Sequence, residues 1–148
     1  MNIEKIAFFA GSFDPFTVGH QSIVERALTL FDRIVIGIGI NSQKIDSEDT
    51  QCRVDDIRSI YGNDPRVEVE AYSDLTWQAA RRCGCTHLLR GVRSVSDFEY
   101  ERNLADANRS LSGMETVILY TLPELSFISS SLVRDLRSHN EDISEFLP

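Results

Sequence analysis

The sequence is poor in the features that define several large classes of protein. Its three cysteines are an odd number and too few for the disulfide framework of a small secreted domain. No apolar run approaches the ~18 residues that a membrane-spanning helix requires. The first residues, Met-Asn-Ile-Glu-Lys, lack the basic and apolar regions of a secretory signal. We therefore expect a cytoplasmic protein with reduced thiols and no membrane segment.

Positive charge is also scarce. The 148 residues include 15 Lys+Arg against 23 Asp+Glu, which gives a formal net charge of -8. This balance argues against a protein that coats nucleic acid or binds membrane surfaces, but it is compatible with a local basic pocket. A chain of this length buries ~68–70% of its unfolded surface, enough for one ordinary core. We therefore expect one domain over residues 1–148.

Short apolar runs alternate with amphipathic stretches along the chain. Strands are expected at 5–10, 33–40, 67–71, 87–90 and 116–121. Helices are expected around 23–31, at 51–61, 74–83, 96–111 and 130–138, and in a final stretch at 141–147. Regular alternation of strand and helix favours a parallel sheet with helices on both faces. The sequence predicts an α/β fold, a single doubly wound domain with a five-stranded parallel sheet.

Three segments that follow predicted strands carry groups suited to binding anions, and ligands of such sheets bind at the carboxyl ends of the strands. The first segment, 11–20, contains two glycines that allow close approach of a ligand. It ends in His20 at a predicted helix start, where free N–H groups and the helix dipole attract anions. Taken alone, the segment fits better a turn in which Thr17 caps the helix and the histidine is incidental.

The second segment, 90–101, begins with two arginines on either side of a glycine. Arg90 and Arg93 can hold phosphates through paired N–H donors. Ser96 is predicted to cap the following helix, with Glu99 completing a capping box three residues later. Glu101, two positions further on, is then expected to be free for a ligand.

The third segment, 126–134, places consecutive serines at a helix start. Hydroxyls and backbone N–H groups there suit a polyphosphate, and Arg134 one turn inside the helix adds positive charge. The alternative is a serine-rich helix cap. Because the three segments follow the first, fourth and fifth strands, we expect them to converge on one crevice.

Together the segments resemble the motifs of the HxGH-type nucleotidylyltransferases. The stretch T-V-G-H matches the first signature of that superfamily, and I-S-S-S-x-x-R matches the second. Within it, G-S-F-D-P-F-T-V-G-H, R-G-V-R-S-V-S-D-F-E-Y-E and S-F-I-S-S-S-L-V-R look most like the bacterial phosphopantetheine adenylyltransferase family. The motifs occur in that family's order and spacing, and the resemblance covers essentially the whole chain. It implies a Rossmann-like nucleotidylyltransferase fold.

The resemblance implies transfer of an adenylyl group from ATP to 4′-phosphopantetheine, giving dephospho-coenzyme A and pyrophosphate by in-line attack of the acceptor phosphate. Such chemistry needs positioning and charge neutralisation rather than a covalent intermediate. The implied catalytic residues are His20, Lys44 and Arg93. The implied ATP-binding residues are Ser12, Phe13, His20, Gly91, Val92, Arg93, Glu101, Leu125, Ser126, Phe127, Ile128, Ser129, Ser130 and Ser131. The implied acceptor-binding residues are Ser12, Lys44, Thr76, Arg90 and Asn108.

The resemblance also implies Mg²⁺ bound through the ATP phosphates rather than in a protein cage, and a homo-oligomer, namely a hexamer. No protein-bound metal is expected, since Cys83 and Cys85 lack the further ligands that a structural zinc site needs. The chain departs from the family's usual pattern in the loop 45–52, which lacks a phenylalanine that is usual there, and at three single positions. Ser12 replaces a threonine, Thr76 replaces a leucine or methionine, and Leu125 replaces a residue that is often aromatic.

Two other functions stay open at this point. One is a sister enzyme that transfers a nucleotidyl group to another phosphorylated acceptor, which a screen of acceptors would separate. The other is a non-catalytic nucleotide sensor on the same scaffold. The presence of His20, Lys44 and Arg93 together argues against the sensor.

Overall fold

Five parallel strands form the centre of the computed structural model, which describes residues 2–148. The strands are β1 (Ile6–Gly11), β2 (Arg33–Gly39), β3 (Val67–Tyr72), β4 (His87–Val92) and β5 (Thr116–Tyr120). Their order is β3-β2-β1-β4-β5, and every neighbouring pair is parallel. The chain builds outward from β1 to β3 and then from β4 to β5 on the other side of β1. This is the predicted doubly wound α/β arrangement, and the prediction is confirmed.

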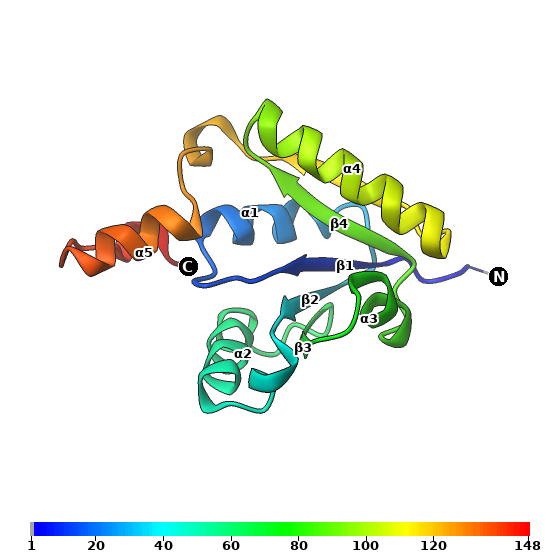
Figure 1. Ribbon diagram of the computed structural model, residues 1–148, viewed down its shortest axis with the longest axis horizontal. Helices are drawn as coiled ribbons and strands as arrows, with labels where there is room; N and C mark the ends of the chain where they lie inside the picture. Colours follow the sequence, from blue (N-terminus) through cyan, green and yellow to red (C-terminus); the bar gives the residue numbers. More distant parts are fainter. Residues whose placement is uncertain (1) are drawn as a thin grey trace.

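Helices cover both faces of the sheet (Figure 1). They are α1 (Val18–Ala27), α2 (Glu48–Tyr61), α3 (Thr76–Arg82), α4 (Val95–Ser112) and α5 (Ser130–Ser138). Successive side chains of a strand point to opposite faces. Accordingly, Ala7 and Phe9 of β1 pack in one apolar cluster with α1 and α2, whereas Phe8 and Ala10 pack in a second cluster with α3.

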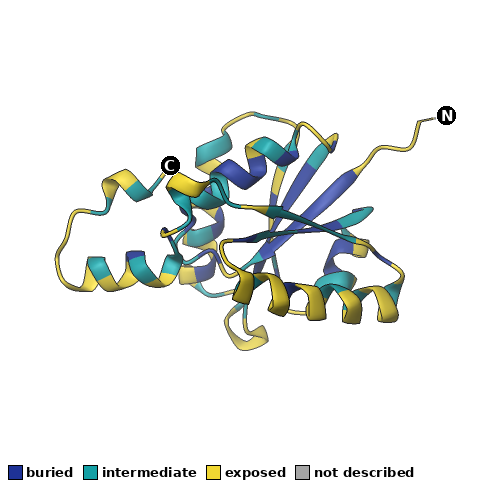
Figure 2. Ribbon diagram, turned by 90° about the horizontal axis from the view of Figure 1, so that it is seen from above, coloured by how far each residue is buried: buried dark blue, intermediate teal, exposed yellow. Residues whose placement is uncertain are grey.

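Burial differs between the central strands and the edges. β1 and β2 are buried on both faces, and this explains why nearly all of their residues are apolar. β3 lies at one edge, and only Val69 and Tyr72 of its six residues are buried. Figure 2 shows buried strands at the centre and the long helix α4 exposed along much of its length. Within residues 2–148, each helix is too short or too polar to cross a membrane.

One predicted helix cap and one predicted helix are wrong. The cap of α4 is Ser94 and not Ser96, because Ser94 has the extended backbone of a cap (φ -151°, ψ 170°) and its hydroxyl accepts from the Asp97 N–H. The capping box with Glu99 therefore does not form. The final stretch 141–147 contains only a 3₁₀ turn, η3 (Ser144–Phe146). So short a segment forms few helical hydrogen bonds for the residues that it would have to order.

The loops that matter for ligand binding all lie at one end of the sheet. In Figure 1, α5 and the chain's C-terminus lie beyond the carboxyl ends of the strands, next to the start of α1. Two further 3₁₀ turns, η1 (Ser42–Lys44) after β2 and η2 (Pro123–Leu125) after β5, belong to connections at this same end. β1 and β4 are neighbours although they are far apart in sequence, so the crevice between their ends is the topological switch point of the fold.

Candidate active site at the switch point

A cavity of about 300 Å³ opens at the carboxyl ends of β1 and β4. Its walls come from the loop after β1, the first turn of α1, the end of β4, the residue after β5 and the first turn of α5. The lining residues are Phe9, Ala10, Gly11, Ser12, Phe13, Thr17, Gly19, His20, Ile23, Arg90, Gly91, Arg93, Thr121, Ile128, Ser129, Ser130, Ser131 and Arg134. The expected convergence of the three anion-binding segments is confirmed.

His20 is fixed by the cap of its own helix. Thr17 is the N-cap of α1, its hydroxyl accepts from the His20 N–H, and its own backbone N–H donates to His20 Nδ1 at 2.9 Å. Nδ1 is thus an acceptor, so the proton of the neutral imidazole is on Nε2. Burial, with help from the positive charges of Arg93 and Arg90, lowers the pKa of His20 to about 4. At neutral pH the ring therefore presents a neutral N–H donor.

The loop after β1 is shaped around an aromatic ring. Phe13 adopts a left-handed backbone conformation (φ 46°), which turns its ring under the loop and edge-on to His20 at 4.9 Å between centroids. A side chain at Gly11 would place its Cβ 2.9 Å from the Phe13 ring, so this position needs glycine. The ring of Phe13 thus packs against both Gly11 and the imidazole of His20.

The start of α5 is tied to the same loop. Ser129 caps α5 by accepting from the Leu132 N–H, while the Ser130 hydroxyl donates to the Pro15 carbonyl at 2.8 Å. Arg134 donates to the Asp14 carbonyl at 2.6 Å and to the Ser131 hydroxyl at 3.2 Å. These contacts point the α5 N-terminus, with its unpaired N–H groups, at the cavity.

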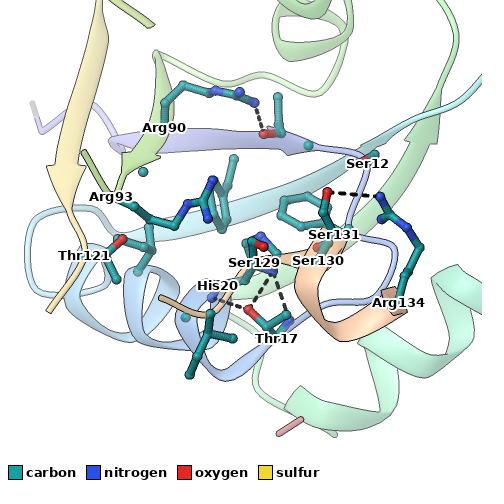
Figure 3. Close-up of a pocket in the computed structure, with 18 residues that line it drawn as sticks. Ser12, Thr17, His20, Arg90, Arg93, Thr121, Ser129, Ser130, Ser131 and Arg134 are labelled. Carbon is teal, nitrogen blue, oxygen red and sulfur yellow. Dashed lines mark hydrogen bonds between the residues drawn. The ribbon is translucent and has the colours of Figure 1, made fainter. Parts of the chain in front are cut away.

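Two arginines from the end of β4 complete the charge of the site. Arg93 forms an ion pair with Asp97 through Nε at 3.3 Å, and its side chain is 41% exposed. Arg90 lies deeper and forms a bidentate pair with Glu101, at 2.7 Å through Nε and 2.6 Å through Nη2. Figure 3 shows Arg93 and Arg134 on opposite sides of the space above His20. The cavity therefore offers cations, hydroxyls and N–H donors, a set suited to a polyanion.

Comparisons with known proteins agree with this geometry. A putative nicotinate-nucleotide adenylyltransferase from Vibrio parahaemolyticus shares the fold, with a TM-score of 0.66, 19% identity, and coverage of 98% of this chain and 94% of its own. Residues 8–136 match the family model described as cytidylyltransferase-like. The phosphopantetheine adenylyltransferase of Porphyromonas gingivalis is 54% identical over 145 residues, which is 98% of this chain and 95% of the relative. That of Bacteroides fragilis is 50% identical over 142 residues, or 96% and 95%.

The chain belongs to the phosphopantetheine adenylyltransferase family. The residues that this family's motifs implied for ATP divide into two groups in the structure. Those that line the cavity are Ser12, Phe13, His20, Gly91, Arg93, Ile128, Ser129, Ser130 and Ser131. Those outside its lining are Val92, Glu101, Leu125, Ser126 and Phe127. Val92 is buried in the sheet, and Phe127 is exposed and packs on Phe146.

Three of the five acceptor-side residues of the family pattern line a second, smaller cavity. Thr76, Arg90 and Asn108 line a space of about 20 Å³, together with Ala10, residues of β4 and β5 and other residues of α4. This is room for about one water molecule. Arg90 and Ala10 line both cavities.

Lys44 and Glu101 differ most from what the sequence suggests. Lys44, the last residue of η1, is exposed and lies outside the lining of both cavities. The prediction that Glu101 is free for a ligand is wrong, because it is only 5% exposed and both carboxylate oxygens accept from Arg90. Burial lowers the pKa of Arg90, but the hydrogen bonds and the charge of Glu101 outweigh burial and raise it above its ordinary value.

Sequence reasoning missed some lining residues. Thr121 was overlooked although it directly follows β5, and the rule that ligands bind at strand ends would have found it. Ile23 lines the cavity from the second turn of α1, and it carried only the signal of a core residue. Thr17 was read as a cap, which is confirmed, and it also faces the cavity.

Proposed function

We propose that the protein transfers the adenylyl group of ATP to 4′-phosphopantetheine, releasing pyrophosphate and forming dephospho-coenzyme A. The observation that carries the proposal is the convergence of three anion-binding segments on one cavity, around a neutral histidine that donates from Nε2. The acceptor phosphate attacks the α-phosphorus in line, and the bond to the pyrophosphate oxygen breaks. Membership of the family supports the choice of both substrates.

His20 donates from Nε2 to an oxygen of the α-phosphate, where negative charge builds up in the transition state. A neutral donor suits this role, because it needs no proton transfer and its orientation is fixed by Thr17. Arg93 and the N-terminus of α5, with Ser129, Ser130 and Ser131, hold the β- and γ-phosphates, and Gly91 and Ile128 lie on the nucleotide side.

Arg90 and Ser12 hold the acceptor phosphate, and Thr76 and Asn108 contact its arm. The position of Arg90 supports this division, because its side chain lines the large cavity and also the small one that Thr76 and Asn108 line. Lys44 extends from the end of η1, and its flexible four-carbon stem lets the ammonium reach the reacting phosphates when they are bound. The role of Lys44 is thus to draw two like-charged groups together.

Mg²⁺ accompanies ATP in this proposal. The cavity lining offers cations, hydroxyls and N–H donors, so the phosphate oxygens supply the hard ligands that Mg²⁺ prefers. The ion would neutralise charge on the triphosphate and leaving pyrophosphate. A single nucleotidylyltransferase domain over 1–148, a hexameric assembly and a cytoplasmic location stay predictions; gel filtration tests the assembly.

The variant His20→Ala tests the catalytic site. Removing one preorganised donor to a developing charge lowers kcat by roughly 10²–10³-fold, whereas ATP binding measured by calorimetry changes little. The control His139→Ala removes an exposed histidine at the end of α5 and leaves turnover unchanged. Unchanged turnover in His20→Ala would remove the histidine from the mechanism.

An acceptor screen tests the substrate. Pyrophosphate release is followed with ATP and 4′-phosphopantetheine, glycerol 3-phosphate or nicotinamide mononucleotide. We expect the highest kcat/KM with 4′-phosphopantetheine. A higher value with either of the other two would overturn the proposed acceptor and indicate a sister nucleotidylyltransferase.

A further inference from the structure

The longest helix, α4, contacts the arginines of the site through two carboxylates. Among the 18 residues of α4, Glu101 is the buried one, and it lies against Arg90 rather than in an apolar contact. One turn earlier, Asp97 lies against Arg93. Positions four apart share a face of a helix, so one face of α4 holds both arginines at the end of β4.

Glu101 and one backbone oxygen fix the deeper arginine from two sides. Glu101 accepts from Nε and Nη2 of Arg90, and the Ala10 carbonyl of β1 accepts from Nη1. A guanidinium has five N–H donors, so three are used and one remains on each terminal nitrogen. Those two donors are oriented by the three used ones, and Arg90 faces both cavities.

Asp97 contacts the backbone N–H and the Nε of Arg93. Asp97 Oδ2 accepts the Arg93 backbone N–H at 3.0 Å and pairs with Nε at 3.3 Å. Both terminal nitrogens of Arg93 are left to face a ligand in the large cavity. The two arginines therefore differ in position, because Arg90 lines both cavities whereas Arg93 lines the large one alone.

We propose that α4 positions two arginines, each for a different substrate. Glu101 orients Arg90 for the acceptor phosphate, and Asp97 orients Arg93 for the nucleotide phosphates. Both are positioning residues, since each acts through an arginine. The inference rests on the proposed function for the identity of the two substrates. It assigns Glu101 to the acceptor side, in place of the nucleotide contact that the family pattern implies.

The test compares Glu101→Gln with Asp97→Asn, two substitutions that remove a charge and keep the shape. A charged hydrogen bond that aligns a phosphate-binding group corresponds to about tenfold or more in binding. We expect Glu101→Gln to raise KM for phosphopantetheine about tenfold and KM for ATP less than about twofold. Asp97→Asn should do the reverse. Asp106→Asn is the matched control, because Asp106 pairs with Arg109 on the exposed side of the same helix.

A purely structural role for the carboxylates predicts a different result. It would lower kcat or raise both KM values together in both variants, and that outcome would overturn the proposal. A rise in KM for ATP alone in Glu101→Gln would also overturn it, in favour of a nucleotide contact. The double variant Arg90→Gln/Glu101→Gln controls for poor folding of the single variant Glu101→Gln. The double variant leaves no buried charge without a partner. Its KM for phosphopantetheine should equal that of Arg90→Gln, and a further rise would contradict positioning through Arg90.

Equilibrium binding separates this inference from the proposed function. ATP is titrated into each variant without acceptor, and we expect about tenfold weaker binding for Asp97→Asn and no change for Glu101→Gln. If the wild-type chain fails to use phosphopantetheine, the proposed function fails while this titration still decides the role of Asp97. Equal ATP affinities in both variants would overturn the division of roles.

Discussion

The helices α1 and α4 differ in how much of their surface is buried (Figure 2). Four of the ten residues of α1 are buried, including Ile23 and Val24, which belong to the same apolar core cluster as residues of the sheet and of α2. In the 18 residues of α4 the buried residue is a carboxylate, Glu101. α1 is therefore held by the hydrophobic effect, whereas α4 is held to a large extent by polar contacts.

The same difference separates their chemical roles. α1 brings its own side chain, His20, into the cavity and orients it through its own cap, Thr17. α4 contributes no lining residue to the large cavity, and it acts on that cavity through two arginines, Arg90 of β4 and Arg93 directly after β4, by pairing Glu101 with the first and Asp97 with the second. A rigid core helix thus supplies the donor in our proposal, and a surface helix adjusts the arginines around it.

The largest loss of stability is expected from the apolar face of α1. Ile23→Ala removes a side chain that is only 2% exposed and leaves a cavity, which costs ~2–5 kcal/mol in the free energy of unfolding. Urea denaturation measures the loss. A cost below about 1 kcal/mol would mean that the core between α1 and the sheet relaxes around the gap.

A smaller, pH-dependent effect is expected from His20. Its pKa is about 4 in the folded protein and 6.5 when unperturbed, so between these values the unfolded chain binds a proton that the folded chain does not. Stability therefore falls as the pH is lowered from about 6.5 to about 4, by up to ~1 kcal/mol per pH unit. His20→Asn keeps an acceptor for the Thr17 N–H and should weaken this dependence, with no change of slope near pH 8. Equal slopes in both proteins over the acidic range would contradict a neutral, buried imidazole.

The smallest effect is expected from the outer surface of α4. Leu111 is 65% exposed, so Leu111→Ala should change the free energy of unfolding by no more than ~0.5 kcal/mol. The same denaturation experiment checks this. A loss comparable with that of Ile23→Ala would show that this surface of α4 is covered in solution, and the contrast between the two helices would then apply to the isolated chain only.

Local patterns predicted much of the fold. β1 and β2 were identified by their apolar runs, and α1 by the helical spacing of residues such as Ile23 and Val24. These patterns are clear because central strands and a core helix bury apolar side chains at regular positions. Weaker elements were placed less well. Ser94 and Ser96 are equivalent caps in a sequence, and only the backbone conformation selects Ser94. The final stretch 141–147 has helical composition but little packing to stabilise a helix.

The sequence predicted individual residues of the candidate site but not the contacts between them. The motifs located His20, Arg93 and the serines of α5, which all line the cavity. They could not show that Glu101 is engaged by Arg90, since that contact joins residues 11 positions apart on different elements. They also could not place Lys44, whose exposed side chain has no packing signal.

The sequence by itself determined the alternation of strands and helices, the residue types of the three anion-binding segments and the family, because each of these is encoded in short stretches of chain. The tertiary structure decided the rest. Setting β4 beside β1 brought Arg90 and Arg93 to His20, and docking α4 on the sheet gave Arg90 its buried partner. Ion pairs and cavities of this kind depend on distances between distant residues, and those distances exist only once the sheet has formed.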